Sequence, residues 1–134
     1  MDEDTRAFNA IIAAFGLPKK NREEQELRKK AIDEATLHAI EVPLEVMKVA
    51  HKGFEVAQAM GETGNPNSIS DAGVGALALN ACVEGAWLNV KINAGDLQSH
   101  PEVERMLREG AAIEQQAEAQ KTMILSLIMQ KINS

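Results

Sequence analysis

Residues 71–93 carry a stripe of small side chains, and this stripe constrains the fold more than any other feature of the sequence. At about 100° per residue, seven of these positions fall within about 80° of one another on an α-helix. The middle of the stripe is small throughout, and its two ends are polar. Small side chains let a second helix or a flat ligand come close, so we expect this face to point inward and to be covered. The stripe consists of Asp71, Gly75, Ala78, Cys82, Gly85, Asn89 and Asn93.

The glycines of this segment support the same interpretation. Gly73, Gly75 and Gly85 each cost roughly 1 kcal/mol inside a helix relative to alanine, and close approach of a neighbour would explain them. Tight helix packing without any chemistry explains the stripe as well as a ligand site does. Four apolar residues on the flank should pack against neighbours: Val74, Ala81, Leu88 and Ile92. Three polar residues fall on the opposite side and should face water: Asn80, Glu84 and Lys91.

The composition limits how a core can be built around such a helix. Of 134 residues, 45% are hydrophobic but only 3% are aromatic, with one Trp and no Tyr. The core must therefore come from Ala, Ile, Leu, Val and Met, a mixture that favours helices packed closely through small side chains. We expect an all-α bundle of about four helices. Because such a core is thin in large side chains, association with a partner would help it bury apolar surface.

Hydrophobic periodicity and helix-end signals divide the first half of the chain into two helical segments. The first runs from about residue 2 to 15, where a Gly-Leu-Pro turn ends it. The second runs from about 21 to 60, and Asn21 should cap it. Pro43 should kink this long helix, because proline removes one backbone donor. Two helices that share a corner at Pro43 are the alternative.

The second half of the chain is divided by turn-forming residues. Residues 61–67 are dense in Gly, Asn and Pro and should form a loop. One of the two serines that follow should cap the third helix, which runs to about residue 93. The fourth helix should span about 101–132, with proline in its first turn. Its apolar end at 123–129 should be buried against neighbours.

Charge and cysteine content exclude several classes of function. The net charge is −6 and the pI is near 5.1, and Lys19, Lys20 and Arg22 form too small a basic cluster for a nucleic-acid interface. Cys82 stands alone, so no intrachain disulfide framework can form, and a small core residue is its expected role. The acidic N-terminus is unlike a signal peptide, and no stretch is apolar enough to span a membrane. We therefore expect a cytoplasmic protein without membrane contact.

Residue spacing argues against metal and nucleotide sites. The chain has no His-x-x-x-His pair, no pair of cysteines and no Glu-x-x-His pair of a carboxylate-bridged di-metal bundle. The glycines of the third helix lack both the spacing and the preceding strand of a phosphate-binding loop. We expect no metal and no nucleotide cofactor.

Four segments, in sequence order, carry a family resemblance. Two are long: Asp-Thr-Arg-Ala-Phe-Asn-Ala-Ile-Ile-Ala-Ala-Phe-Gly-Leu-Pro-Lys at 4–19, and Ala-Cys-Val-Glu-Gly-Ala-Trp-Leu-Asn-Val-Lys-Ile-Asn at 81–93. Two are short: Val-Pro-Leu around Pro43, and Ser-Asp-Ala-Gly-Val-Gly-Ala at 70–76. Together they resemble the formimidoyltransferase-cyclodeaminase family. Four motifs in order are much more specific than any one alone.

The resemblance implies an enzyme that acts on one-carbon adducts of tetrahydrofolate. A cyclodeaminase closes formimidoyltetrahydrofolate to methenyltetrahydrofolate and releases ammonia, a lyase step of histidine breakdown. Relatives are cyclohydrolases, which hydrolyse methenyltetrahydrofolate. The family fold is an all-helical bundle that forms homodimers, with the folate site at or near subunit contacts. The folate is the substrate, and the resemblance implies no metal and no separate cofactor.

Two features of the family are missing from this sequence. The family domain opens with a glycine-rich helical segment before the first motif, and bifunctional members add a transferase domain. Residues 1–134 are therefore similar to the later part of a cyclodeaminase domain. We expect a partial domain of that type.

Ring closure with loss of ammonia requires a positioned acid or base, because protons move to and from nitrogen. Asp4 and Asp71 match the aspartates of two family motifs, and they are the catalytic candidates. Capping of two helix N-termini is the alternative explanation for both positions.

Two pairs of residues are candidates for binding the substrate. Asn89 and Asn93 lie one turn apart, and each can donate and accept hydrogen bonds to the pterin or amide groups of folate. Hydrogen bonding between helices is the alternative. Lys19 and Lys20 follow the Leu-Pro turn and would attract the anionic glutamate tail of folate, unless they form only an exposed charged loop.

A non-catalytic helical oligomerisation module is the competing interpretation. In this interpretation the small-residue stripe is only an interface between subunits, and the apolar end of the fourth helix completes that interface. A folate analogue should raise the melting temperature of a folate enzyme, since a ligand of the native state stabilises it. An assembly module should show only a dependence on protein concentration.

Overall fold

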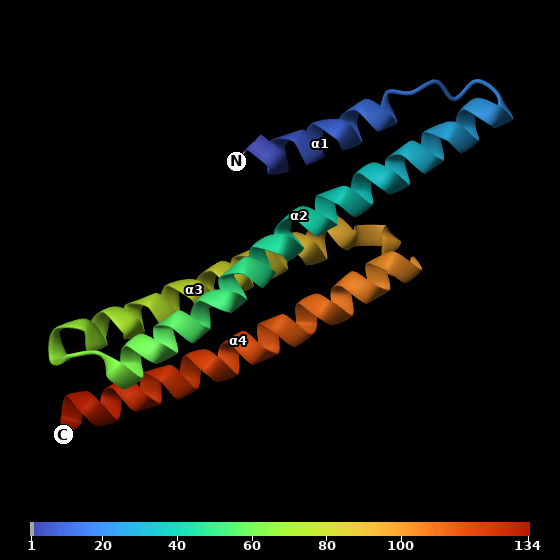
Figure 1. Ribbon diagram of the computed structural model, residues 1–134. Helices are drawn as coiled ribbons and strands as arrows, with labels where there is room; N and C mark the ends of the chain where they lie inside the picture. The colour runs from blue at the N-terminus through green and yellow to red at the C-terminus, as the bar shows by residue number, and fades with distance from the viewer. Residues whose placement is uncertain (1) are drawn as a thin grey trace.

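The computed structural model describes residues 2–134 and contains α-helices joined by short connections (Figure 1). Within this part of the chain there are four α-helices, one short 3-10 helix and no strand. The predicted all-α bundle is therefore confirmed. The elements are α1 (Asp2–Phe15), α2 (Arg22–Thr63), α3 (Pro66–Ala94), η1 (Gly95–Leu97) and α4 (Pro101–Asn133).

The helices form a three-helix bundle with a two-helix arm. The second half of α2, α3 and α4 lie side by side, and each packs against the other two. The first half of α2 projects beyond this bundle, and α1 packs along it to form the arm (Figure 1). Lys131 Nζ of α4 donates to the backbone oxygen of Glu62 at 2.7 Å, which caps the last turn of α2 with a cation.

Helix α2 runs through Pro43 without interruption. The prediction of one long helix is confirmed, and the alternative of two helices sharing a corner is wrong. Its beginning is also as predicted, because the Asn21 side chain accepts a hydrogen bond from the Glu24 backbone at 2.8 Å. The degree of bending at Pro43 stays a prediction.

The connection between α2 and α3 is shorter than the expected loop at 61–67. Helix α2 continues to Thr63, and α3 begins at Pro66. The expectation that Ser68 or Ser70 caps α3 is wrong, because the Asn65 side chain accepts from the Ser68 backbone at 3.2 Å. Asn65 with proline at the first helical position makes a complete start signal, and it precedes both serines.

The core lies in the three-helix bundle and consists mainly of Ala, Ile, Leu, Val and Met, as expected, with Phe54 in addition. Its largest fully buried side chains include Phe54, Ile40, Met47, Met106 and Ile124. The end of α4 is buried only on its inner side. Ile128 is buried, whereas Met123 and Met129 are more than half exposed, so the prediction that residues 123–129 are buried against neighbours holds for only part of this segment within one chain.

Helix α3 buries a different face from the one expected. Asn80 is buried, and its Nδ2 donates to Glu118 Oε2 at 3.2 Å, so the prediction that Asn80 faces water is wrong. Cys82 is exposed rather than part of the core. The predicted packing of Val74, Leu88 and Ile92 is also wrong within one chain, because all three are more than 60% exposed. The face of α3 that is buried was not recognised from the sequence, because the polar Asn80 interrupts its apolar residues. These residues are Ile69, Ala72, Ala76, Val83, Val90 and Ala94.

A candidate binding pocket between α1 and α3

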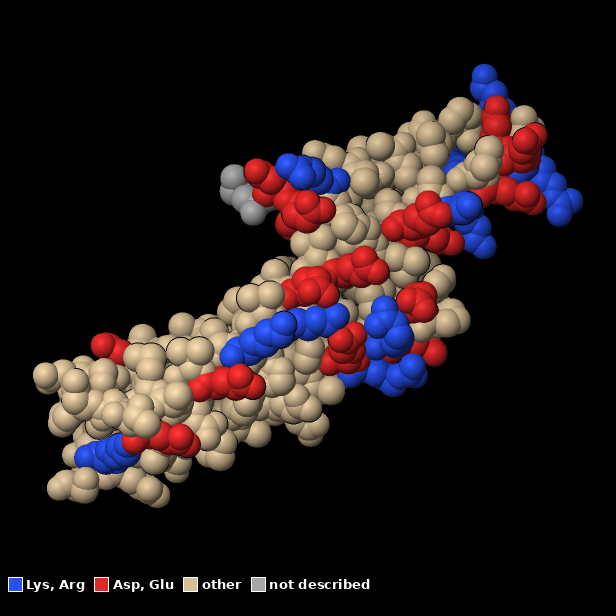
Figure 2. Space-filling view, in the orientation of Figure 1, with Lys and Arg blue, Asp and Glu red and all other residues tan. Residues whose placement is uncertain are grey.

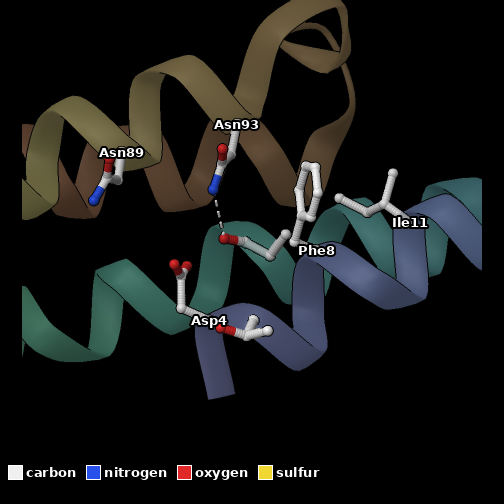
Figure 3. A pocket seen from close by; sticks show the side chains of 7 residues that line it. Asp4, Phe8, Ile11, Asn89 and Asn93 are labelled. Atoms are coloured by element: carbon white, nitrogen blue, oxygen red, sulfur yellow. Dashed lines mark hydrogen bonds between the residues drawn. The ribbon is translucent and has the colours of Figure 1, made fainter. Parts of the chain in front are cut away.

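A pocket of about 280 Å³ lies where α1, α2 and α3 meet, and side chains of all three helices line it. Figure 3 shows Asp4 on α1 and the two asparagines on α3 pointing toward the same space. Three of the residues singled out from the sequence, Asp4, Asn89 and Asn93, therefore line one pocket although the first two are 85 positions apart. The other lining residues are Thr5, Phe8, Ile11 and Ala39.

Helix α1 is held on α2 at both of its ends. Near its start, His38 Nε2 lies 3.0 Å from Glu3 Oε1. At its end, Arg28 Nε donates to the Phe15 carbonyl at 3.2 Å, and the guanidinium lies 5.4 Å from the centre of the Phe15 ring. A cation at a helix C-terminus also interacts favourably with the helix dipole. These contacts join α1 to α2 near both ends of α1 and help to position Asp4.

The chemistry of the pocket is mixed. The Asp4 carboxylate accepts hydrogen bonds, and the Asn89 amide can both donate and accept. Phe8 and Ile11 supply an apolar wall on the α1 side. Such a lining fits a flat heterocycle that carries donors and acceptors on its edge. Pockets for whole ligands measure about 300–1,000 Å³, so this pocket is large enough for a ring system but not for a long ligand in full.

The Asn93 side chain already has a partner in the protein. Its Nδ2 donates to the backbone oxygen of Ala39 on α2 at 2.9 Å, shown by the dashed line in Figure 3. This is an interhelical hydrogen bond, the alternative role that the sequence left open for the asparagines. Of the two asparagines, Asn89 is the more exposed and is directed at the pocket without that constraint.

Asp71 lies elsewhere in the molecule. It lines a shallow, mainly apolar groove of about 550 Å³ between α2 and α3, together with Gly53, Met60 and Gly75. Asp71 and Asn89 are 18 positions apart on one helix, a separation of about 27 Å. A single chain therefore does not bring the two predicted catalytic aspartates together.

Lys19 and Lys20 are also outside the pocket. They lie in the exposed turn between α1 and α2, beyond the last residue of α1. Asp4 and Phe15 are 11 positions apart on that helix, which alone is about 16 Å. The backbone N–H of Lys20 donates to the Glu24 carboxylate at 2.8 Å. Figure 2 shows acidic and basic side chains interleaved at this end of the arm, so the lysines do not form an isolated basic patch.

The sequence did not single out Thr5, Phe8, Ile11 and Ala39 as site residues. A signal for two of them was present, because Asp4, Phe8 and Ile11 are spaced i, i+4 and i+7 and share one face of α1. Ala39 carries no such signal. It lines the pocket because α2 packs against both α1 and α3.

The small-residue stripe is open on its outer side. A Cβ added at Gly75 or Gly85 would meet no atom within 4 Å, whereas one at Gly73 would contact Ile128. A second groove, of about 420 Å³, continues along the same side between α2 and α3. Within one chain, the prediction that the stripe faces inward is therefore wrong for its small-residue centre, which is an outer surface. The end of the stripe at Asn89 and Asn93 lines the α1–α3 pocket.

Among residues 2–134, no group of three or more His, Cys, Asp or Glu side chains is placed to hold a metal ion. No helix in the same range is long and apolar enough to cross a membrane.

Comparison with known proteins gives consistent matches. Residues 1–112 match the family model described as formiminotransferase-cyclodeaminase. A methenyltetrahydrofolate cyclohydrolase of Methylorubrum extorquens is 37% identical over 131 residues, which cover 98% of this chain and 63% of that protein. The formimidoyltransferase-cyclodeaminases of Rattus norvegicus and Dictyostelium discoideum are 33% and 34% identical over 93% of this chain, and the matched residues make up 23% and 22% of those proteins. The chain thus spans less than two thirds of each of these relatives.

Proposed function

The chain belongs to the formiminotransferase-cyclodeaminase family, and from this membership we propose that its α1–α3 pocket binds the pterin end of a one-carbon tetrahydrofolate. The observation that carries the proposal is the meeting of Asp4 and Asn89 at one pocket. They come from two separate motifs, and each has the chemistry that a pterin requires. The pocket is also large enough for the pterin rings but not for the whole folate, so the remainder of the folate would lie along the surface.

The reaction that we favour is the cyclodeaminase reaction. The amine nitrogen next to the pterin ring attacks the carbon of the protonated formimidoyl group, which the ring nitrogen carries, and loses its own proton. The formimidoyl nitrogen gains a proton, its bond to that carbon breaks, and it leaves as ammonia. The products are methenyltetrahydrofolate and ammonia. In this proposal Asp4 accepts the first proton and returns it to the leaving nitrogen, and Asn89 would orient the pterin.

Methenyltetrahydrofolate hydrolysis is the second candidate. It is favoured by the 37% identity to a named cyclohydrolase over 98% of the chain. In this reaction water adds to the methenyl carbon, and Asp4 would accept a proton from that water. One of the two carbon–nitrogen bonds of the bridge then breaks as the hydroxyl proton passes to its nitrogen, and formyltetrahydrofolate is the product. Both reactions share methenyltetrahydrofolate, so one pocket can serve either of them.

The open stripe leads to a second part of the proposal. An apolar face with glycines at its centre is suited to a neighbour that approaches closely, and a second copy of the chain is the simplest one. In such a homodimer the groove beside Asp71 would be closed. The dimer and a cytoplasmic location stay proposals, as do roles for Asp71, Lys19 and Lys20.

An absorbance assay for methenyltetrahydrofolate tests the proposal. With formimidoyltetrahydrofolate as substrate, a cyclodeaminase raises the methenyl absorbance; with methenyltetrahydrofolate, a cyclohydrolase lowers it. Asp4→Asn should reduce kcat by about 100-fold or more, the range for loss of a general acid or base. Asp2→Asn is the matched control, because Asp2 lies in the same helical turn but does not line the pocket.

Equal activity of Asp4→Asn and Asp2→Asn would remove Asp4 from the mechanism. Absence of turnover with both substrates, together with an unchanged melting temperature when tetrahydrofolate is added, would refute the folate site and favour the oligomerisation module.

A further inference from the structure

Pro43 leaves one backbone oxygen of α2 without its helical donor. In an α-helix the N–H of each residue donates to the carbonyl four positions earlier, and proline has no N–H. For Pro43 that carbonyl belongs to Ala39. Ala39 is 5% exposed, so water has little access to it. A buried carbonyl without a partner is costly, and a replacement donor is needed.

The replacement donor comes from α3. Asn93 Nδ2 donates to the Ala39 carbonyl at 2.9 Å. Because a carbonyl can only accept, the nitrogen of the Asn93 amide must be the atom that faces it. Ala39 and Asn93 both line the α1–α3 pocket, so the interruption in the hydrogen bonds of α2 lies directly beneath it.

We propose that Asn93 is a positioning residue that replaces the donor removed by Pro43, and so sets the place of α3 over the pocket. Asn89 lies one turn before Asn93, on the same face of α3. When the Asn93 amide is bound to α2, the rotation of this part of α3 is fixed, and Asn89 is held opposite Asp4. The effect on ligand binding rests on the proposed folate site, whereas the bond itself does not.

A double-mutant cycle tests this inference with Asn93→Ala, Pro43→Ala and the double variant. Pro43→Ala returns an N–H to position 43, which can then donate to Ala39. Alone, Asn93→Ala should lower the urea midpoint of unfolding and weaken tetrahydrofolate binding about tenfold, as expected for loss of a bond that leaves a buried acceptor unpaired. In the Pro43→Ala background the same change should leave the midpoint nearly unaltered and weaken binding less than about threefold.

Asn89→Ala is the matched control, and it should weaken binding equally in both backgrounds. If Asn93→Ala also weakens binding equally in both and does not change the urea midpoint, Asn93 is a ligand contact and the inference is wrong. If Asn93→Ala alone does not fold, Pro43→Ala should restore folding, and failure to do so overturns the inference. The effects of Asn93→Ala and Pro43→Ala on the urea midpoint could be coupled although the unaltered chain does not bind tetrahydrofolate. That result would support the Asn93–Ala39 bond and refute the folate site.

Discussion

At the scale of single residues, Glu118 illustrates how the neighbours of one carboxylate set its titration. Lys121 Nζ donates to Glu118 at 2.7 Å, and this bond holds the pKa of Glu118 below its usual range. The buried Asn80 adds a smaller contribution through its 3.2 Å bond to the same side chain. Both bonds favour the charged carboxylate, so folding lowers the pKa of this group.

A pH dependence of stability follows for Glu118. A carboxylate with a lowered pKa in the folded state stabilises the protein above its unfolded-state pKa, and this contribution is lost as the pH falls through the folded-state pKa. Glu118→Gln should therefore lower the free energy of unfolding at neutral pH but not at strongly acidic pH. Urea unfolding at both pH values measures the difference. A difference of the same size at both would show that the charge of Glu118 contributes nothing.

At the scale of helices, the packing of α3 on α4 depends on one glycine. A Cβ at Gly110 of α4 would overlap the Trp87 ring of α3, with Cε3 only 2.8 Å away. The indole is rigid and lies between two helices, so it cannot move aside without shifting one of them.

Gly110→Ala should therefore destabilise the protein although alanine is the better helix former. Overpacking costs about 1–3 kcal/mol, which exceeds the gain of roughly 1 kcal/mol in helix propensity. Urea or thermal unfolding of the variant and the unaltered chain measures the net change in stability. A variant as stable as the unaltered chain would show that α3 and α4 do not approach as closely at Trp87 as described.

The helices themselves were predictable from sequence because their signals are local. Periodicity, the proline at the start of the fourth helix and the Asn21 cap predicted four helices, with ends close to those observed. Asp4 and Asn89 could also be selected, since they belong to recognisable motifs. The buried face of α3 could not be assigned, because both sides of this helix carry apolar residues and Asn80 interrupts the apolar residues of its buried face. The sequence shows which residues share a face, but not which face meets a neighbour in the same chain.

At the scale of the whole molecule, the chain is an elongated bundle with apolar residues on its outer surface. Val49 and Val56 of α2 and Val74 and Ile92 of α3 are all more than 60% exposed. Gly75 and Gly85 lie on the same side of α3 with nothing against them in the chain. Exposed apolar surface of this kind indicates an interface.

Gly85→Ala should have opposite effects on the folded chain and on its assembly. In the single chain there is room for the methyl group, so helix propensity should add roughly 1 kcal/mol to stability. In a dimer that meets closely at the stripe, the same methyl group should weaken association, by about tenfold for each 1.4 kcal/mol of strain. Analytical ultracentrifugation over a range of concentrations measures this, with Glu84→Ala as a neighbouring control. Unchanged association, or a monomer at all concentrations, would contradict the proposed dimer.

The central claim is that the α1–α3 pocket, and not the α2–α3 groove, receives the folate. Amide chemical shifts of the isotope-labelled protein during a titration with tetrahydrofolate test it directly. The account predicts that the perturbed amides cluster at residues 4–11, at Ala39 and at 89–93. Perturbations centred instead on residues 53–60 and 71–79, or no perturbation at saturating ligand, would contradict it.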